Sequence, residues 1–330
     1  MNDQTIHHAI REAIEKAGRI AIASHVRPDG DAIGSVLGLG LALEAAGKQV
    51  EMVMVDGVPT SFHHLYGHKK VQRALTRPVD LRISVDASDY ERLGGAYQGE
   101  TVDINIDHHI TNLQFGRINL VEPETVATSE VIARYLAGWG LPMTVHTAEA
   151  LVTGIVTDTI GFRTSNVTPE SLRTTALLME QGANLHELYS RGLVYRTYSE
   201  ARYWGAGLNR LQREDGLIWT VLTLDDRKAI GYNRNDDAEL NSVLSSIQEA
   251  DITVLLIEQK ENRVKVSWRA RPGIDVSQVA LSFGGGGHPA ASGADISGSL
   301  EDTLPKVLEA TKKVLELKQN GEAPPVLRKD

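Results

Sequence analysis

Residues 25–35 read His-Val-Arg-Pro-Asp-Gly-Asp-Ala-Ile-Gly-Ser and join two segments with different patterns. Residues 19–24, just before them, are rich in apolar and β-branched side chains, as in a buried strand. Residues 32–46 are mostly small and apolar and are suited to a buried helix. The stretch is therefore predicted to be a turn that leads from a strand into a helix.

Three side chains in this turn can bind a hard or borderline cation: His25, Asp29 and Asp31. Pro28 presets its own backbone angle and Gly30 allows positive φ, so the two carboxylates can converge. In open α/β sheets, ligands bind at the carboxyl ends of the parallel strands. A plain turn and helix cap, with Asp31 accepting from the first helical amides, is the alternative. The rest of the chain decides against that alternative.

Composition narrows the class of protein. The 330 residues exceed what one hydrophobic core usually organises, so two domains are expected. The net charge of −9 disfavours long duplex nucleic acid, which needs many Lys and Arg contacts, but allows a short anionic substrate held by metal ions. The absence of cysteine excludes disulfides and thiolate chemistry. No apolar stretch reaches membrane-spanning length and no signal-peptide core is evident, so we expect a cytoplasmic protein without a membrane partner.

Five more ligand-type side chains stand at the ends of predicted elements. Predicted strands over residues 81–85 and 101–106 and a predicted helix over 147–157 end, respectively, at Asp86, at Asp107-His108-His109 and at Asp158. A single Asp at such a position is usually a helix cap, and two histidines are often only polar surface. Capping does not explain why several separate element ends carry ligand types. We therefore expect these side chains to meet in one site.

The chemistry of this set favours two metal ions. It combines carboxylate oxygen with imidazole nitrogen and contains no sulfur, which favours Mn²⁺ or Mg²⁺ over structural Zn²⁺. The set is too large for one catalytic ion that keeps open positions. Two ions about 3.5–4 Å apart can share a carboxylate, hold hydroxide and clamp a phosphoryl oxygen. Hydrolysis of a phosphate ester is therefore the favoured reaction on chemistry alone.

The order of predicted elements indicates the fold class. Strands and helices alternate through the first part, which predicts an α/β domain with a doubly wound, mainly parallel sheet. The second part predicts a smaller α/β domain with a mixed sheet, because residues 252–269 have the pattern of a hairpin. The expected ranges are 1–190 for the catalytic domain, 191–214 for a helical linker, 215–319 for the second domain and 320–330 for a disordered tail. Helices are also expected from Tyr90 and over 236–248.

Several stretches resemble the motifs of one family, the DHH phosphoesterases. In the first part these are residues 25–35, Val85-Asp86-Ala87-Ser88-Asp89, Asn105-Ile106-Asp107-His108-His109 and Thr157-Asp158-Thr159. In the second part, residues 283–293, with a Gly-Gly-Gly-Gly-His run, resemble the signature of the associated DHHA1 domain. The motifs occur in the family's order and span nearly the whole chain. The compact length is similar to that of the branch with nanoRNase (oligoribonuclease) and 3′-phosphoadenosine 5′-phosphate phosphatase activity.

The resemblance implies a role for each site residue. The implied ligands are His25, Asp29 and Asp86 for one Mn²⁺, and Asp31, Asp86, His108 and Asp158 for a second, with Mg²⁺ as a substitute. Asp86 would bridge the two ions. His109 would face the scissile phosphate as a catalytic group that stabilises charge or protonates the leaving oxygen. Asp107 would orient a histidine.

The resemblance also implies contacts to substrate. His288 and the amides of Gly284, Gly285, Gly286 and Gly287 would form an anion-binding nest for a second phosphate, with Arg269 beside them. A flexible hinge is the alternative for the glycines, but a hinge does not need a terminal His. Many relatives follow the Thr-Asp-Thr motif directly with Gly, whereas Ile160 precedes Gly161 here. Arg163, in the same loop, is either a phosphate contact or a surface charge.

These assignments imply a hydrolase with its site in a cleft between the two domains. The implied substrates are single-stranded oligoribonucleotides of two to five nucleotides, linear dinucleotides such as pApA, and 3′-phosphoadenosine 5′-phosphate. A cyclic-dinucleotide phosphodiesterase and an inorganic pyrophosphatase or polyphosphatase are alternatives on the same metal site. A nucleotide-binding sensor without catalysis is an alternative of another class, although every ligand position is filled. A homodimer is expected by analogy alone.

Overall fold

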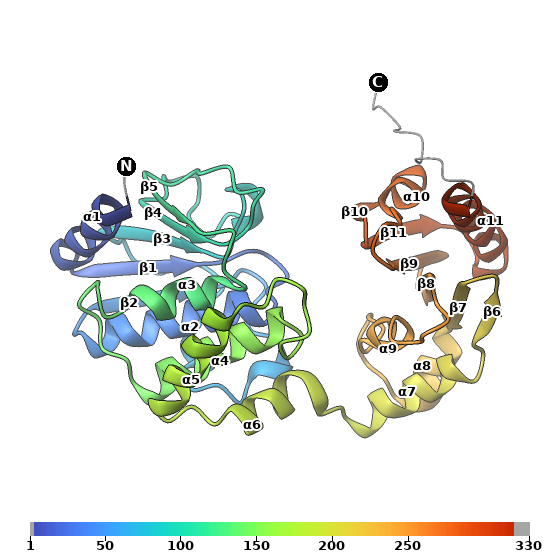
Figure 1. Ribbon diagram of the computed structural model, residues 1–330, viewed down its shortest axis with the longest axis horizontal. Coiled ribbons are helices and arrows are strands. Elements are labelled where there is room, and N and C mark those ends of the chain that lie inside the picture. Colours follow the sequence, from blue (N-terminus) through green and yellow to red (C-terminus); the bar gives the residue numbers. More distant parts are fainter. Residues whose placement is uncertain (1–2, 320–330) are drawn as a thin grey trace. The chain divides into compact units, whose positions relative to one another are not determined.

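The computed structural model describes residues 3–319, so the expected tail at 320–330 lies outside the described part. It divides the chain into two compact units, Met1–Tyr195 and Arg196–Asp330. Each unit is built around its own sheet (Figure 1). No helix within the described residues is both long and apolar enough to cross a membrane.

The described part of the first unit has one sheet whose strands all run parallel, in the order β2-β1-β3-β4-β5. Its strands are β1 (Arg19–Ala23), β2 (Gln49–Val53), β3 (Leu81–Val85), β4 (Ile104–Asp107) and β5 (Ile118–Val121). The chain places β2 on one side of β1 and β3 on the other. The carboxyl ends of β1 and β3 therefore form a topological switch point, the usual place for a ligand site in such sheets.

Helices of the first unit pack mainly against one face of this sheet (Figure 1). They are α1 (Asp3–Lys16), α2 (Gly30–Ala45), α3 (Thr128–Tyr135), α4 (Val145–Asp158), α5 (Pro169–Glu180) and α6 (Leu185–Tyr189), which continues into a π-helical turn, Ser190–Val194. Residues 30–43 of α2 are all buried, because the sheet covers one side and α4 the other. A Cβ atom on Gly34 would lie only 2.6 Å from the Ala150 carbonyl oxygen of α4, so glycine is what allows this close approach.

The other face of the sheet is covered by a segment with little regular structure. Ala21 and Ala23 of β1 pack there against Leu93 and Tyr97. The hydroxyl of buried Tyr97 donates to the Ile83 carbonyl, at 2.5 Å. The helix expected from Tyr90 is wrong: only a 3₁₀ turn forms, Glu91–Leu93, because Gly94 and Gly95 then take positive φ. Two further 3₁₀ turns are Thr60–Phe62 and His68–Lys70.

The second unit contains a mixed sheet in the order β10-β11-β9-β8-β7-β6, which confirms the predicted fold class. Its strands are β6 (Gln212–Glu214), β7 (Leu217–Leu222), β8 (Ile252–Gln259), β9 (Arg263–Ala270), β10 (Gly286–His288) and β11 (Ala291–Ser297). Only β7 and β8 run parallel among these described pairs, and β8 and β9 form the expected hairpin. The helices are α7 (Tyr198–Leu208), α8 (Leu224–Ile230), α9 (Leu240–Leu244), α10 (Ser277–Ser282) and α11 (Leu300–Gln319).

Two local expectations in the second unit need correction. The helix expected over 236–248 is reduced to α9, because Ala238 and Glu239 take positive φ and the Asp236 side chain accepts from the Ala238 amide. The amides of Gly284 and Gly285 donate to carbonyls at the end of α10, at 2.9 and 2.8 Å. The predicted anion-binding nest therefore does not include these two amides.

Candidate metal centre

Every ligand-type residue predicted in the first unit lies at the carboxyl edge of its sheet. His25 follows β1 by two residues, Asp86 follows β3 directly, and Asp107 is the last residue of β4. Asp29 and Asp31 flank the start of α2, His108 and His109 follow β4, and Asp158 ends α4. The switch point between β1 and β3 therefore brings together side chains that are far apart in sequence.

The first group of ligand atoms consists of His25, Asp29 and Asp86. Nε2 of His25 lies 3.7 Å from Oδ2 of Asp29 and 3.6 Å from Oδ2 of Asp86. Oδ1 of Asp29 also accepts from the amides of Asp31 and Ala32, at 3.1 Å each. The helix cap considered for Asp31 is thus made by Asp29, whose second oxygen stays directed at His25.

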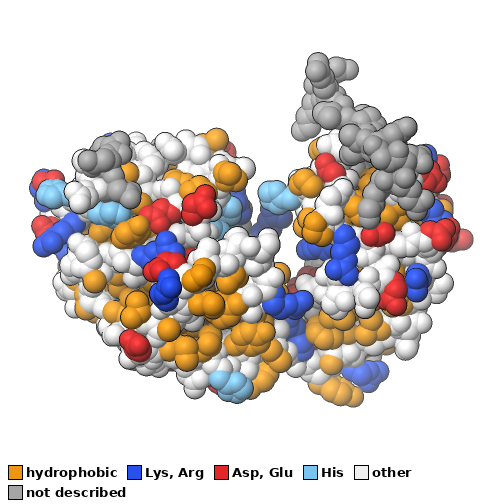
Figure 2. Space-filling view, viewed as in Figure 1, with side chains coloured by type: hydrophobic (Ala, Val, Ile, Leu, Met, Phe, Trp, Pro, Cys, Tyr) orange, Lys and Arg blue, Asp and Glu red, His pale blue; other side chains and the backbone are white. Residues whose placement is uncertain are grey.

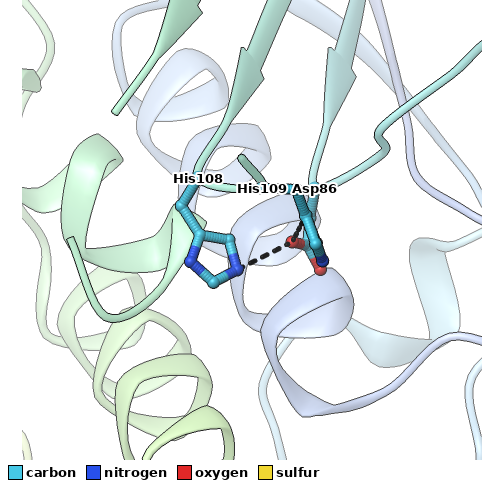
Figure 3. Close-up of side chains that lie close together, drawn as sticks. All are labelled: Asp86, His108 and His109. Carbon is cyan, nitrogen blue, oxygen red and sulfur yellow. Dashed lines mark ion pairs between the residues drawn. The ribbon is translucent and has the colours of Figure 1, made fainter. Parts of the chain in front are cut away.

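The second group consists of Asp31, His108 and Asp158. Nε2 of His108 lies 4.0 Å from Oδ2 of Asp31 and 3.7 Å from Oδ2 of Asp158. The same nitrogen lies 3.8 Å from Oδ1 of Asp86, an approach drawn in Figure 3. Asp86 thus faces His25 with one oxygen and His108 with the other.

These separations fit atoms that share a metal ion. They are too long for hydrogen bonds, but two atoms each about 2.1 Å from one ion can be up to about 4.2 Å apart. Nδ1 of His25 lies 2.9 Å from the Val26 carbonyl oxygen, and Nδ1 of His108 lies 3.4 Å from that of Thr125. Because a carbonyl can only accept, Nδ1 of each ring carries a hydrogen, so Nε2 is the atom that faces the carboxylates and that would bind a cation in place of its proton. The residues therefore fit two divalent cations.

Asp31 is fixed by contacts that the sequence motifs do not contain. Its oxygens accept from the amides of Thr128, at 2.7 Å, and Ser129, at 2.9 Å, in the first turn of α3. The Thr128 hydroxyl also donates to Oδ1 of Asp86, at 3.0 Å. The helix N-terminus thus orients two carboxylates at once.

The charges in the cluster are unbalanced. Burial raises the pKa of Asp31 well above its usual range, and Asp86 and Asp158 raise it further. Burial also raises the pKa of Asp158, to about 6. Burial alone would lower the pKa of His25, but the side chains of Asp29 and Asp86 raise it to about 10. Buried carboxylates this close together need positive charge, which bound cations supply.

Asp86 adopts a backbone conformation that is uncommon for residues other than glycine. Its φ is +55°, in the left-handed region. Its amide donates to the Ile106 carbonyl at 3.0 Å, and Thr128 holds its side chain. Conformations of this kind cost about 1–3 kcal/mol and concentrate at functional sites.

His109 lies within a third group of possible ligand atoms, with Asp86 and His108, but its shortest contact is to another residue. Its Nδ1 lies 3.7 Å from Oδ1 of Asp86, an approach drawn in Figure 3. The same nitrogen is only 2.7 Å from Oδ1 of buried Asp107. The bond to Asp107 raises the pKa of His109. Burial would raise the pKa of Asp107, but the bonds from His109 and Asn112 lower it. Because Nδ1 donates to Asp107, Nε2 is the nitrogen left for a reacting group.

The residues predicted to contact substrate lie on the second sheet and in the loop after α4. On the second sheet, His288 pairs with Ala291, and Ala291 pairs with Arg269, so all three side chains stand on one face. Arg269 is half-buried, donates to the Trp268 carbonyl at 2.9 Å, and has its pKa lowered by burial. In the first unit, Arg163 is exposed in the loop after α4.

The extra residue in that loop has a local consequence. Ile160, Gly161 and Phe162 all have positive φ. A Cβ atom at Gly161 would lie 2.4 Å from the ring of Tyr189. Glycine is therefore required at this position, and the loop packs on the end of α6.

Comparison with known proteins agrees with this architecture. Residues 19–155 match the DHH family, N-terminal domain, and residues 220–317 match the DHHA1 domain. The chain is 36% identical over 310 residues to the bifunctional oligoribonuclease and PAP phosphatase NrnA of Thermus thermophilus, covering 93% of this chain and 92% of that protein. It superimposes on an exopolyphosphatase-related protein from Bacteroides fragilis with a TM-score of 0.86 and 26% identity, over 95% of this chain and 96% of that one.

A more distant structure shares the fold. RecJ of Thermus thermophilus, solved in complex with Mn²⁺, aligns with a TM-score of 0.54 and 16% identity, over 99% of this chain and 56% of that one. Three observations agree on the family: the two domain matches, the 36% identity over 93% of this chain, and the cluster of Asp and His residues. The chain belongs to the DHH family of phosphoesterases.

Proposed function

We propose that this chain hydrolyses short oligoribonucleotides, including linear dinucleotides such as pApA, to mononucleotides, and removes the 3′-phosphate of 3′-phosphoadenosine 5′-phosphate. The observation that carries the proposal is Asp86, whose two oxygens face two separate groups of metal-ligand atoms. The relative with both activities in its name supports the choice of substrates. The cytoplasm, where short RNA and nucleotides are processed, is the proposed location.

We assign His25, Asp29 and Asp86 to one ion and Asp31, Asp86, His108 and Asp158 to the other. The mixture of carboxylate and imidazole ligands favours Mn²⁺, with Mg²⁺ as a weaker substitute. Bound there, two such ions supply Lewis-acid chemistry, lower the pKa of a water and stabilise charge on the phosphoryl group. The protein's part is to hold six ligand side chains in place from five elements and their loops.

The proposed role of His109 follows from its tautomer. With Nδ1 donating to Asp107, Nε2 is free to meet a phosphoryl or leaving oxygen. A raised pKa keeps a larger fraction of the ring protonated near neutral pH, so Nε2 can donate. His109 would thus stabilise charge or deliver the proton that the leaving oxygen needs.

In the second unit, we propose that Arg269 and His288 bind another phosphate of the substrate. They stand on one sheet face, two strands apart, with only the small Ala291 between them. Neighbouring strands are about 4.8 Å apart, so about 10 Å separates the two backbones, a span that one phosphate and two long side chains can fill. The contacts of Gly286, Gly287 and Arg163 with substrate also stay proposals.

The function is tested by turnover of pApA and 3′-phosphoadenosine 5′-phosphate with Mn²⁺, in the parent, Asp86→Ala and His288→Ala. We expect the parent to act on both, Asp86→Ala to be inactive, and His288→Ala chiefly to raise KM. A parent that binds these nucleotides but turns over neither with any divalent ion would be a sensor. Preference for a cyclic dinucleotide over pApA would favour the cyclic-dinucleotide phosphodiesterase.

A further inference from the structure

We propose that Asn112 is a positioning residue that acts through Asp107 to hold His109 in its reactive orientation; this inference rests on the proposed function. The carboxylate of Asp107 is completely buried. Oδ1 accepts from Nδ1 of His109 at 2.7 Å, and Oδ2 accepts from Nδ2 of Asn112 at 2.5 Å. Oδ1 also accepts from the His108 amide at 2.8 Å, whereas Oδ2 is held by the asparagine.

The orientation of the Asn112 amide is determined by its partners. Its Oδ1 accepts from the backbone N–H of Gln114, at 2.7 Å, and from Nδ2 of Asn105, at 3.0 Å. Its Nδ2 donates a second hydrogen bond, to the Ala87 carbonyl at 3.0 Å. A backbone N–H can only donate and a carbonyl can only accept, so the amide cannot be turned round. Nδ2 must therefore face Asp107.

These bonds link the parts of the site that carry the chemistry. Asn112 connects β4, through Asn105 and Asp107, to the segment after β3, where Ala87 follows the strained Asp86. Apolar packing does little to hold the loop itself, because Ile110 is 87% exposed and Leu113 is 72% exposed. Hydrogen bonds from one side chain therefore supply much of the loop's definition.

Loss of Asn112 would leave Oδ2 of Asp107 buried without this donor. An unsatisfied buried acceptor costs free energy, more so when it is charged, and the carboxylate would turn to recover a partner. With Oδ1 still bonded to the His108 amide, the turned carboxylate would meet Nδ1 of His109 at a poorer angle, and the ring would lose its fixed direction. The reaction would slow although no atom that touches substrate had been removed.

The test is a double-mutant cycle in kcat for pApA hydrolysis with Asn112→Ala and His109→Ala. We expect Asn112→Ala to lower kcat about 10- to 100-fold with little change in KM or in bound Mn²⁺. In the His109→Ala background, Asn112→Ala should lower kcat less than about twofold further, because its effect passes through His109. The proposal would be overturned if Asn112→Ala lowered kcat equally in both backgrounds, or if it raised KM and left kcat unchanged.

Asn119 offers a matched control. It lies near the same loop, and its side chain bridges the backbone of Gly116 by bonds of 3.0 and 2.6 Å without contacting Asp107. Asn119→Ala should leave kcat unchanged. If Asn112→Ala does not fold, the nearly isosteric and uncharged Asn112→Leu, which also loses both donors, should show the same pattern in the cycle.

A crystal structure of Asn112→Ala tests the inference independently of activity. The proposal predicts that the 2.7 Å bond between His109 and Asp107 is lost or that the His109 ring turns. An unchanged bond and ring would overturn the proposal even if the parent proved inactive. Inactivity of the parent on short oligoribonucleotides, with a displaced ring in the variant, would instead refute the proposed function alone.

Discussion

Asp86 is held at its backbone and faces a histidine with each of its carboxylate oxygens. Its oxygens face His25 and His108, its amide is bonded to β4, and its φ of +55° suits Asn as well as Asp. Asp86→Asn should therefore fold without new backbone strain but lose the charge needed to bridge two cations. We expect kcat for pApA to fall at least about 10³-fold, whereas stability in EDTA should equal or exceed that of the parent, since repulsion with Asp31 is relieved.

Turnover assays with Mn²⁺ and thermal unfolding in EDTA measure these two effects. Activity of Asp86→Asn within tenfold of the parent would show that Asp86 does not bridge two ions. A large loss of stability of Asp86→Asn in EDTA would contradict the expected relief of repulsion between Asp86 and Asp31.

At the residue scale, sequence predicts side-chain chemistry better than backbone chemistry. His25, Asp86 and His108 could be chosen because their types are those of metal ligands. The amides of Thr128 and Ser129, which hold Asp31, could not, because every residue except proline carries an amide. The bonds of Asn112 were missed for a similar reason, since a polar residue in a polar loop gives no signal.

At the scale of elements, the contact between α2 and α4 sets the distance between the residues that the two helices carry. Gly34→Ala would place a Cβ 2.6 Å from a backbone oxygen and 2.8 Å from the Gly154 nitrogen, so the helices must separate. We expect a loss of about 1–3 kcal/mol in urea unfolding, and weaker Mn²⁺ binding as Asp31 and Asp158 move apart. An unfolding midpoint equal to the parent's would contradict this account.

Gly40 of the same helix is the matched control. A Cβ there would meet the Met52 side chain at 2.4 Å, but that side chain is flexible and can move. In a helix interior, alanine is also more favourable than glycine by about 1 kcal/mol. Gly40→Ala should therefore be much less destabilising than Gly34→Ala and should leave Mn²⁺ binding intact.

The start of α8 gives a pH-dependent prediction. Burial would raise the pKa of Asp226, but bonds from Arg210, at 2.8 Å, and from Thr223 lower it. A lowered pKa in the folded state stabilises the protein above the unfolded value, about 3.9, and the benefit is lost as pH falls through the folded value. The difference in melting temperature between the parent and Asp226→Asn should thus be large at pH 7 and shrink toward pH 3. A difference independent of pH would argue against this linkage.

Elements with strong patterns could be predicted, and short ones could not. The apolar runs of β1 and β8 and the capped start of α5 each carry their own signal. β5 has only four residues, and its pairing with β4, Ile104 opposite Ile118, exists only in the folded sheet. α8 has only seven residues, too few for a clear apolar period, although Thr223 and Asp226 form a capping box at its start. The glycine-rich run became β10 because β11 supplies its partner.

At the scale of the whole molecule, the net charge bears on the class of substrate, and the division into two units bears on where metal ions bind. On the face in Figure 2, Lys and Arg side chains are intermixed with Asp and Glu over both units, in keeping with a net charge of −9. A surface of this kind suits short substrates gripped at a few points better than long strands. All the candidate metal ligands lie in the first unit.

Metal binding should therefore stabilise the first unit. At a free Mn²⁺ concentration 100 times Kd, mass action adds about 2.7 kcal/mol for one site. Differential scanning calorimetry should show a higher unfolding temperature on adding Mn²⁺, which Asp86→Asn abolishes and Arg269→Ala retains. An equal shift in Asp86→Asn would place the stabilising ion elsewhere.

The most direct test of the two-metal centre is a crystal structure of the protein with Mn²⁺, using anomalous scattering to locate the ions. The account predicts two anomalous peaks about 3.5–4 Å apart, one contacted by His25 and Asp29, the other by Asp31, His108 and Asp158, with Asp86 between them. A single peak, or a peak ligated by Nδ1 of His109 in place of its bond to Asp107, would contradict it.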